Sequence, residues 1–172
     1  NEQCAFTRFS GGVFGVLDLK KLLDGSAESI AFSCELDADG MSDDILSGCV
    51  KASGRVENHS GYIVLHGLAD TEFTVNCARC GRQFVYTEPV TLEAKITDKL
   101  ANKDEDEFLL LQDGLLDIGE YVRTAVILEL PSRFLCREEC KGLCPKCGAD
   151  LNAATCSCGD KEPDPRWDAL KA

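Results

Sequence analysis

The alternation of apolar and polar positions predicts a β-rich fold over most of the first hundred residues. Four segments alternate in this way, and short turn signals such as Asp39-Gly40 separate them. They span Ser29 to Leu36, Gly48 to Asn58, Tyr62 to Asn76 and Gln83 to Thr97. Because consecutive strands joined by short turns pair with their neighbours, the pattern predicts an antiparallel β meander or a partly closed barrel.

A helical spacing of apolar residues interrupts this pattern near the start of the β-rich region. From Val16 to Leu23 apolar side chains recur every three or four positions, and Asp24-Gly25 follows as a stop signal. The sequence therefore predicts a short amphipathic helix at this place.

A second helix is predicted after the strands. Asp117 to Glu120 has the form of a capping box, and Pro131 ends the apolar stretch that follows it. The buried side of this helix is expected to carry Val122, Ala125, Val126 and Leu128. Its β-branched residues also allow a strand. With one or two helices beside an antiparallel sheet, the fold class is α+β.

Beyond Ser132 the chain has few large apolar residues, so something other than an apolar core must organise it. We therefore expect residues 1–131 to form a mainly antiparallel β domain with short helices. Residues 132–172 then form a cysteine-rich, zinc-ribbon-like tail packed on that domain.

Cysteine supplies the candidate chemistry. The chain has 11 cysteines, and eight of them fall into a pair at Cys77 and Cys80 and a run from Cys136 to Cys158, with turn-forming glycine and proline beside the sulfurs. Structural zinc takes four ligands, and a Cys-x-x-Cys pair supplies half of such a site. The preferred tail site is Cys144, Cys147, Cys156 and Cys158, and a second site combines Cys77, Cys80, Cys136 and Cys140.

The second site would attach the tail to a hairpin tip, because the pair at Cys77 and Cys80 lies between two predicted strands. One or two structural zinc ions are thus expected. Spacing alone leaves an iron–sulfur cluster, free or redox-active thiols and disulfides open. The remaining cysteines, Cys4, Cys34 and Cys49, are expected to pack in the core.

Net charge bears on the choice of partner. The formal charge is −12 at pH 7, from 18 basic and 30 acidic residues. Nucleic-acid affinity comes mostly from lysine and arginine, and no dense basic segment is present, so unaided binding of RNA or DNA is not expected. A basic protein suits the negative field better. A local basic face around Arg137, Lys141 and Lys146 would keep a nucleic-acid-binding ribbon open.

Compartment and catalysis are constrained mainly by what the sequence lacks. An odd number of cysteines and an opening without a basic start and apolar middle favour a reducing, cytoplasmic compartment, although the absence of an initial Met leaves a removed segment open. No stretch has the ~20 apolar residues of a membrane span. No phosphate loop, nucleophile elbow or His-Glu-x-x-His motif is present, so neither a catalytic residue nor a small-molecule substrate is expected.

The motifs of the tail together resemble those of one family. Cys140-Lys-Gly-Leu-Cys-Pro-Lys-Cys-Gly-Ala-Asp-Leu-Asn152, Cys156-Ser-Cys158 and Asp164-Pro-Arg-Trp-Asp-Ala-Leu170 follow the earlier Cys77-Ala-Arg-Cys80 and Leu128-Glu-Leu-Pro131. This combination is similar to the YceD family over most of the chain. The resemblance implies a bacterial or organellar factor needed for large-subunit ribosomal RNA to accumulate, without known catalytic activity. Family members vary in these cysteines, which favours a stabilising role for the metal.

Three functional hypotheses follow. The first is a non-catalytic assembly factor that acts through a basic ribosomal or assembly protein, with Asp164, Arg166 and Trp167 as a candidate interaction element. The second is a thiol redox protein or sensor that uses Cys77 and Cys80, with Arg79 lowering a thiolate pKa. The third is the zinc-ribbon nucleic-acid-binding module.

Overall fold

The computed structural model describes residues 15–59, 62–97 and 108–158. These residues form eight strands and two helices. In chain order they are β1 (Val16–Asp18), α1 (Lys20–Leu23), β2 (Ser29–Asp37), β3 (Ile45–His59), β4 (Tyr62–Asn76), β5 (Gln83–Tyr86), β6 (Pro89–Thr97), β7 (Phe108–Leu110), β8 (Leu115–Asp117) and α2 (Ile118–Glu129).

The main sheet is an open antiparallel meander with one parallel edge. Its strand order is β2-β3-β4-β6-β7, with β5 also paired to β4, while β1 and β8 form a separate two-stranded sheet. Among the strands that the structure describes, only the β6–β7 pair is parallel. The predicted meander is therefore confirmed in its open form. The predicted last strand is divided at Thr87–Glu88 into β5 and β6, which both pair with β4.

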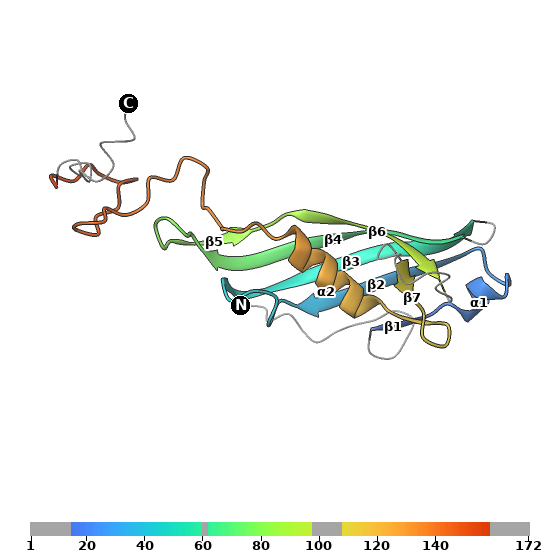
Figure 1. The fold of residues 1–172 in the computed structure, drawn as a ribbon. Helices are drawn as coiled ribbons and strands as arrows, with labels where there is room; N and C mark the ends of the chain where they lie inside the picture. The colour runs from blue at the N-terminus through green and yellow to red at the C-terminus, as the bar shows by residue number, and fades with distance from the viewer. Residues whose placement is uncertain (1–14, 60–61, 98–107, 159–172) are drawn as a thin grey trace, which may run out of the picture.

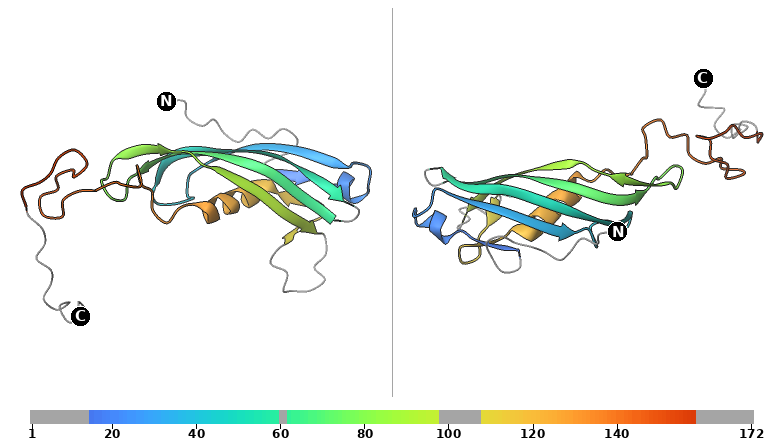
Figure 2. Two further views of the ribbon diagram at one scale, coloured as in Figure 1. Left: turned by 90° about the horizontal axis from the view of Figure 1, so that it is seen from above. Right: turned by 180° about the vertical axis from the view of Figure 1, so that it is seen from behind.

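Helix α2 lies across one face of this sheet, and no described helix lies on the other face (Figure 1; Figure 2). The core fills the space between α2 and the sheet. Strand β4 illustrates how one face of the sheet is buried. Its side chains Leu65, Ala69 and Phe73 are completely buried, whereas every second residue from His66 to Glu72 is exposed on the opposite face.

The first predicted helix is correct only in its second half. Val16–Asp18 is a strand, because its backbone pairs with Leu115–Asp117, a partner almost one hundred positions away that periodicity cannot reveal. The short α1 follows, and Leu19 and Leu22 are completely buried as the helical spacing requires.

The second helix agrees closely with its sequence signals. The Asp117 carboxylate accepts a 2.9 Å hydrogen bond from the Glu120 N–H, and the backbone becomes extended at Leu130, just before Pro131. Val122 and Val126 are buried as predicted. The prediction for Leu128 is wrong: this side chain is 78% exposed, because it lies on the solvent side of the helix.

After α2 the chain runs along the sheet and beyond the end that carries the β4–β5 hairpin (Figure 1). Phe134 is buried there, and its ring packs edge-on against Tyr86 with centroids 5.1 Å apart. The expected boundary at residue 131 thus precedes a side chain that belongs to the core of the β domain.

Candidate metal centres

The structure brings the eight clustered cysteines into two groups. The proximal cluster contains Cys77, Cys80, Cys136 and Cys140, and the distal cluster contains Cys144, Cys147, Cys156 and Cys158. Within each cluster all four sulfur atoms lie within 4.8 Å of one another. Each group can therefore hold a metal ion, and each has the membership expected from the sequence.

In each cluster the Cys-x-x-Cys pair, Cys77 and Cys80 or Cys144 and Cys147, sits on a backbone turn, and the two turns have the same hydrogen bonds. In the proximal cluster the Gly81 N–H donates to the Cys77 carbonyl at 2.8 Å, and the Cys77 N–H donates to the Arg82 carbonyl at 2.9 Å. The distal turn repeats both contacts at 2.8 Å: Gly148 N–H donates to the Cys144 carbonyl, and Cys144 N–H donates to the Ala149 carbonyl. The two Cys-x-x-Cys-Gly segments are thus equivalent knuckles.

The sulfur spacing fits a single tetrahedral ion. In the proximal cluster the sulfur atoms of Cys77 and Cys140 lie 3.8 Å apart, as do those of Cys80 and Cys136. Ligands about 2.3 Å from a tetrahedral zinc are about 3.8 Å from one another. A cubane cluster binds its cysteines through separate irons and therefore spreads their sulfurs further apart. All ten cysteines in the described ranges are free of disulfides.

The electrostatics of both clusters favour a bound cation. Burial raises the pKa of Cys77, but backbone N–H groups of Cys136, Cys80 and Arg79 outweigh it and lower the pKa to about 6. In the distal cluster, backbone N–H groups of Cys147 and Lys146 lower the pKa of Cys144 to about 6. These donors stabilise a thiolate on each knuckle.

The opposite shift occurs at one cysteine in the other half of each cluster. Burial, and then the neighbouring side chains of Cys77 and Cys140, raise the pKa of Cys136 to about 12. The Cys147 side chain, followed by burial, raises the pKa of Cys158 to about 12. Four like charges cannot be held so close together without compensation, and a divalent cation supplies it.

The proximal cluster forms where the tail contacts the β4–β5 hairpin. The Arg79 guanidinium donates 2.9 Å hydrogen bonds to the carbonyl oxygens of Glu138 and Cys140. The Leu143 N–H donates to the Arg79 carbonyl at 3.2 Å. Gly142 has a φ of +71°, and a Cβ there would lie 2.8 Å from that same carbonyl oxygen. The hairpin and the tail therefore approach so closely that this position requires glycine.

Asn152 connects the two clusters and was not singled out from the sequence. It lies between the two halves of the distal cluster, yet its side-chain nitrogen is 3.5 Å from the sulfur of Cys140 in the proximal cluster. The sequence shows that Asn152 follows Cys147-Gly-Ala-Asp-Leu, but only the folded loop shows its contact with the Cys140 sulfur.

Two of the three isolated cysteines can be located. Cys34 is buried in the core as predicted, and burial raises its pKa to about 11. The prediction is wrong for Cys49, which is half-buried on the uncovered face of the sheet, because it alternates along β3 with the buried Val50 and Ala52. Cys4 and the candidate interaction residues Asp164, Arg166 and Trp167 lie outside the described residues.

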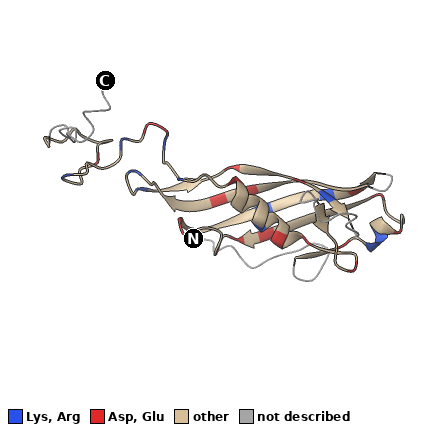
Figure 3. Ribbon diagram, in the orientation of Figure 1, with Lys and Arg blue, Asp and Glu red and all other residues tan. Residues whose placement is uncertain are grey.

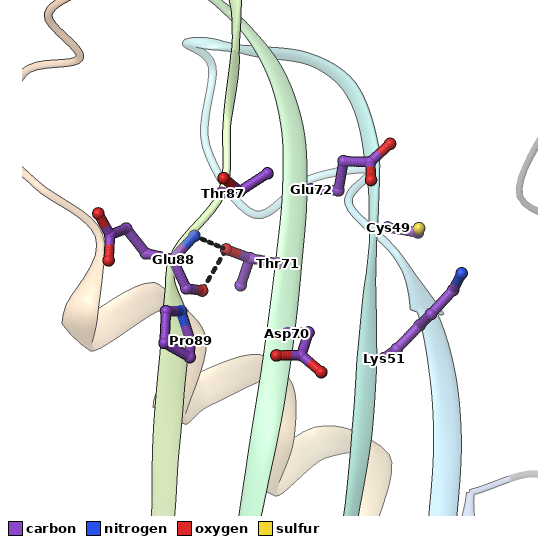
Figure 4. A pocket seen from close by; sticks show the side chains of 8 residues that line it. All are labelled: Cys49, Lys51, Asp70, Thr71, Glu72, Thr87, Glu88 and Pro89. Carbon is purple, nitrogen blue, oxygen red and sulfur yellow. Dashed lines mark hydrogen bonds between the residues drawn. The ribbon is translucent and has the colours of Figure 1, made fainter. Parts of the chain in front are cut away.

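A shallow cavity of about 320 Å³ lies on the uncovered face of the sheet (Figure 4). Its charged side chains are Asp70 and Glu72 on β4, Glu88 at the β5–β6 junction and Lys51 on β3. The three carboxylates form no ion pair with any other residue in the described ranges. This surface was missed because its residues come from different strands.

Two basic side chains of the tail make internal contacts. Arg137 donates to the Asn152 side chain at 2.7 Å, Lys146 donates to the Cys158 carbonyl at 3.2 Å, and Arg82 of the hairpin contacts Asp150 at 3.4 Å. Acidic positions are interspersed with them along the tail (Figure 3). The basic positions of the described tail are therefore interrupted by acidic ones.

None of the helices in the described ranges has both the length and the apolar character needed to span a lipid bilayer.

Comparison with known proteins gives a consistent set of matches. A family model described as "Large ribosomal RNA subunit accumulation protein YceD" matches residues 65–172. An uncharacterised protein of Mycobacterium tuberculosis is 35% identical over 122 residues, which cover 67% of this chain and 58% of the relative. No solved structure shows a significant match.

Two further relatives extend the comparison. A chloroplastic protein of Arabidopsis thaliana, named as a large ribosomal RNA subunit accumulation protein YCED homolog, is 29% identical over 62% of this chain and 42% of its own length. The uncharacterised protein YlbN of Bacillus subtilis is 26% identical over 71% of this chain and 72% of its own length. The matched part of this chain thus covers about half the length of the mycobacterial and plant relatives.

Proposed function

This chain belongs to the YceD family of large ribosomal RNA subunit accumulation proteins, and from that membership we propose that it is a non-catalytic factor in large-subunit biogenesis. The observation that carries the proposal is the family match over residues 65–172, which includes both cysteine clusters. Its action is to allow the large ribosomal RNA to accumulate. The place of action is the compartment that assembles ribosomes, which is the cytoplasm in a bacterium.

The proposed direct partner is a basic ribosomal or assembly protein. The formal charge of −12 repels a phosphate backbone and attracts a lysine- and arginine-rich protein. Ribosomal RNA is then protected indirectly, through the protein that binds it.

The uncovered face of the sheet is the surface that supports this partner best. Asp70 and Glu72 line the cavity there beside the single positive charge of Lys51, and Glu88 lies at its edge with its carboxylate pointing away from them (Figure 4). Because Lys51 does not form an ion pair with these carboxylates, they remain available to an incoming basic side chain. The proposed occupant is a basic segment of a protein, which the charge of this face complements.

The proposed role of metal is structural. Four thiolates at tetrahedral spacing suit zinc and leave no open coordination position for a reacting water. Residues 148–155 contain no buried side chain, so apolar packing does not account for their fold. Structural zinc supplies on the order of 10 kcal/mol in small peptides, enough to organise such a segment.

The two alternatives are weaker on specific grounds. A redox role for Cys77 and Cys80 would need an accessible pair of thiols, whereas Cys77 is buried and both sulfurs belong to a four-sulfur group. A nucleic-acid-binding ribbon would need a strongly basic face, whereas Glu138, Glu139 and Asp150 lie among the basic residues of the described tail.

The test combines an rRNA measurement with a binding measurement. Cells depleted of this protein are complemented with the wild type, with Asp70→Lys plus Glu72→Lys, or with the control Glu28→Lys plus Glu129→Lys, which makes the same charge change at exposed positions elsewhere. The ratio of large- to small-subunit rRNA is measured in each strain. In parallel, purified large-subunit proteins and isolated rRNA are titrated with each variant at several salt concentrations.

We expect the wild type and the control to restore the rRNA ratio and to bind one or more basic large-subunit proteins, with affinity falling as salt rises. The β4 double variant should do neither. The proposed function is contradicted if depletion leaves the rRNA ratio unchanged. The proposed partner is contradicted if isolated rRNA binds tightly while the basic proteins do not.

A further inference from the structure

The side chain of Asn152 joins the two cysteine clusters, and we propose that it couples them, so that metal bound at the distal cluster raises the metal affinity of the proximal cluster. This inference depends on the proposal that both clusters bind metal.

The Asn152 amide uses its full hydrogen-bonding capacity at the junction of the clusters. Its nitrogen donates to the Asp150 carboxylate at 2.8 Å and to the Cys140 sulfur at 3.5 Å. Its oxygen accepts from the Lys141 N–H at 2.8 Å and from the Arg137 guanidinium at 2.7 Å. An amide has two donors and two acceptor lone pairs, so this network fixes its orientation and directs one N–H at the proximal sulfur.

The loop that carries Asn152 is anchored at both ends by the distal cluster. It begins after Cys147 and ends before Cys156. Its backbone then folds against the segment that connects the clusters: Leu151 N–H donates to the Gly142 carbonyl at 3.0 Å, and Leu143 forms a β-bridge with Asp150. None of residues 148–155 is buried. The position of Asn152 therefore depends on these contacts and on the metal that holds the two ends of its loop.

The proximal cluster needs such help more than the distal cluster does. Its halves are far apart in sequence, with 63 positions between Cys77 and Cys140, whereas 14 positions separate Cys144 from Cys158. The distal cluster therefore binds metal within one local segment, whereas the proximal cluster must join the tail to the hairpin. When its loop is in place, Asn152 donates to the Cys140 sulfur and accepts a hydrogen bond from the Lys141 N–H. These two contacts orient Cys140 in the second half of the proximal cluster.

The expected size of the effect follows from the kind of contact. A hydrogen bond from outside the coordination sphere to a metal ligand typically changes metal affinity by about 10- to 100-fold. Coupling of binding free energies is reciprocal, so proximal metal raises distal affinity by the same factor.

The test measures site-resolved affinity in the full chain with ¹¹³Cd²⁺ as the probe and a competing chelator. Cys77→Ser and Cys147→Ser assign the NMR resonances of the two clusters. Proximal affinity is then compared in the wild type, in the distal knock-out Cys156→Ser plus Cys158→Ser, in Asn152→Ala, and in the combination of the last two. Asn76→Ala is the matched control, because Asn76 is exposed and adjacent to Cys77 but makes no hydrogen bond to a described sulfur.

We expect the distal knock-out and Asn152→Ala each to lower proximal affinity by about tenfold or more. The combined variant should lose less than about twofold beyond the knock-out, because Asn152 acts only when the distal loop is held. Asn76→Ala should leave the affinity within about twofold of the wild type. A merely structural role for Asn152 would instead lower affinity equally in both backgrounds.

The coupling is overturned if proximal affinity is the same with the distal cluster intact or removed, or if Asn152→Ala leaves the difference unchanged. Those results leave the proposed function standing, since rRNA accumulation is measured separately. A full chain that binds neither Cd²⁺ nor Zn²⁺ overturns both the coupling and the proposed role of metal.

Discussion

The sulfur atoms of Cys77 and Cys140 lie 3.8 Å apart although 63 positions separate the two residues. This contact places the hairpin and the tail on one candidate metal site. A metal bound there would stabilise the tail against the β domain, in addition to the hydrogen bonds that Arg79 donates to the tail backbone.

The variant Cys136→Ser should bind one metal ion per chain where the wild type binds two. Serine is a poor zinc ligand in place of thiolate, so the proximal cluster loses a corner while all four distal sulfurs remain. We expect metal analysis of zinc-saturated protein to give about two ions per wild-type chain and about one per variant chain. Limited proteolysis should also cut the variant faster between α2 and the distal cluster.

Cys49→Ser is the control for that measurement, because Cys49 belongs to neither cluster. It should retain both ions. If Cys136→Ser keeps two ions, the proximal assignment is wrong.

Gly142→Ala should weaken the attachment of the tail more than Gly148→Ala does. Both glycines have positive φ, +71° and +73°, so alanine carries the same backbone penalty of roughly 1–2 kcal/mol at each. Only at Gly142 would the new Cβ lie 2.8 Å from the Arg79 carbonyl oxygen; at Gly148 no atom lies within 4 Å.

The difference between the two variants isolates this close contact. Resistance of the bound metal to a chelator, followed over time, should fall in the order wild type, Gly148→Ala, Gly142→Ala. Equal loss in the two variants would show that the approach of the tail to Arg79 does not limit its stability.

On helix α2, Val122→Ala should destabilise the fold and Leu128→Ala should not. Val122 is completely buried, and removing its methyl groups loses about 2 kcal/mol of apolar burial and packing. Leu128 is 78% exposed, and alanine is a good helix former, so its change should stay within about 0.5 kcal/mol. Urea unfolding followed by circular dichroism measures both values.

This pair also tests which side of the helix faces the sheet. A cost at Leu128 that equals the cost at Val122 would mean that the helix is rotated relative to the described structure.

Cys34 should resist alkylation in the folded protein at pH 8, whereas Cys49 should react. Burial raises the pKa of Cys34 to about 11, so only about one thiol in a thousand is ionised at pH 8, and the side chain is also inaccessible. Reactivity of Cys34 should rise as pH increases towards 11, because the thiolate is the reactive form. Mass spectrometry of peptides after iodoacetamide treatment locates the modified residues.

The denatured protein serves as the reference in that experiment, since unfolding exposes Cys34 and restores an ordinary thiol pKa. Rapid modification of Cys34 at pH 8 without unfolding would contradict its place in the core.

The meander was predictable because its strands are neighbours in sequence, and their alternation reports one buried face. Strand β4 agrees with its predicted bounds, Tyr62 to Asn76. Local signals also fixed the start of α2 at Asp117 and its end before Pro131. The errors occur where a distant partner decides the structure: Val16–Asp18 is a strand because Leu115–Asp117 lies beside it.

The cysteine groups were predictable for a similar reason. Each cysteine pair is a local half-site, and three half-sites in the tail plus one in the hairpin leave few ways to complete the two sets. Asn152 and the acidic face around Asp70 and Glu72 were not predictable, because neither carries a local pattern that distinguishes it from other exposed polar residues.

The sequence by itself determined the strand meander, the second helix, the family and the cysteines that can share an ion, because each of these is encoded by residues close together or by a distinctive motif. Only the tertiary structure decided which sheet face stays uncovered, how the tail contacts Arg79 and how Asn152, in the loop of the distal cluster, reaches Cys140 of the proximal cluster. Those relationships depend on the packing of segments far apart in the chain, which periodicity and spacing do not record.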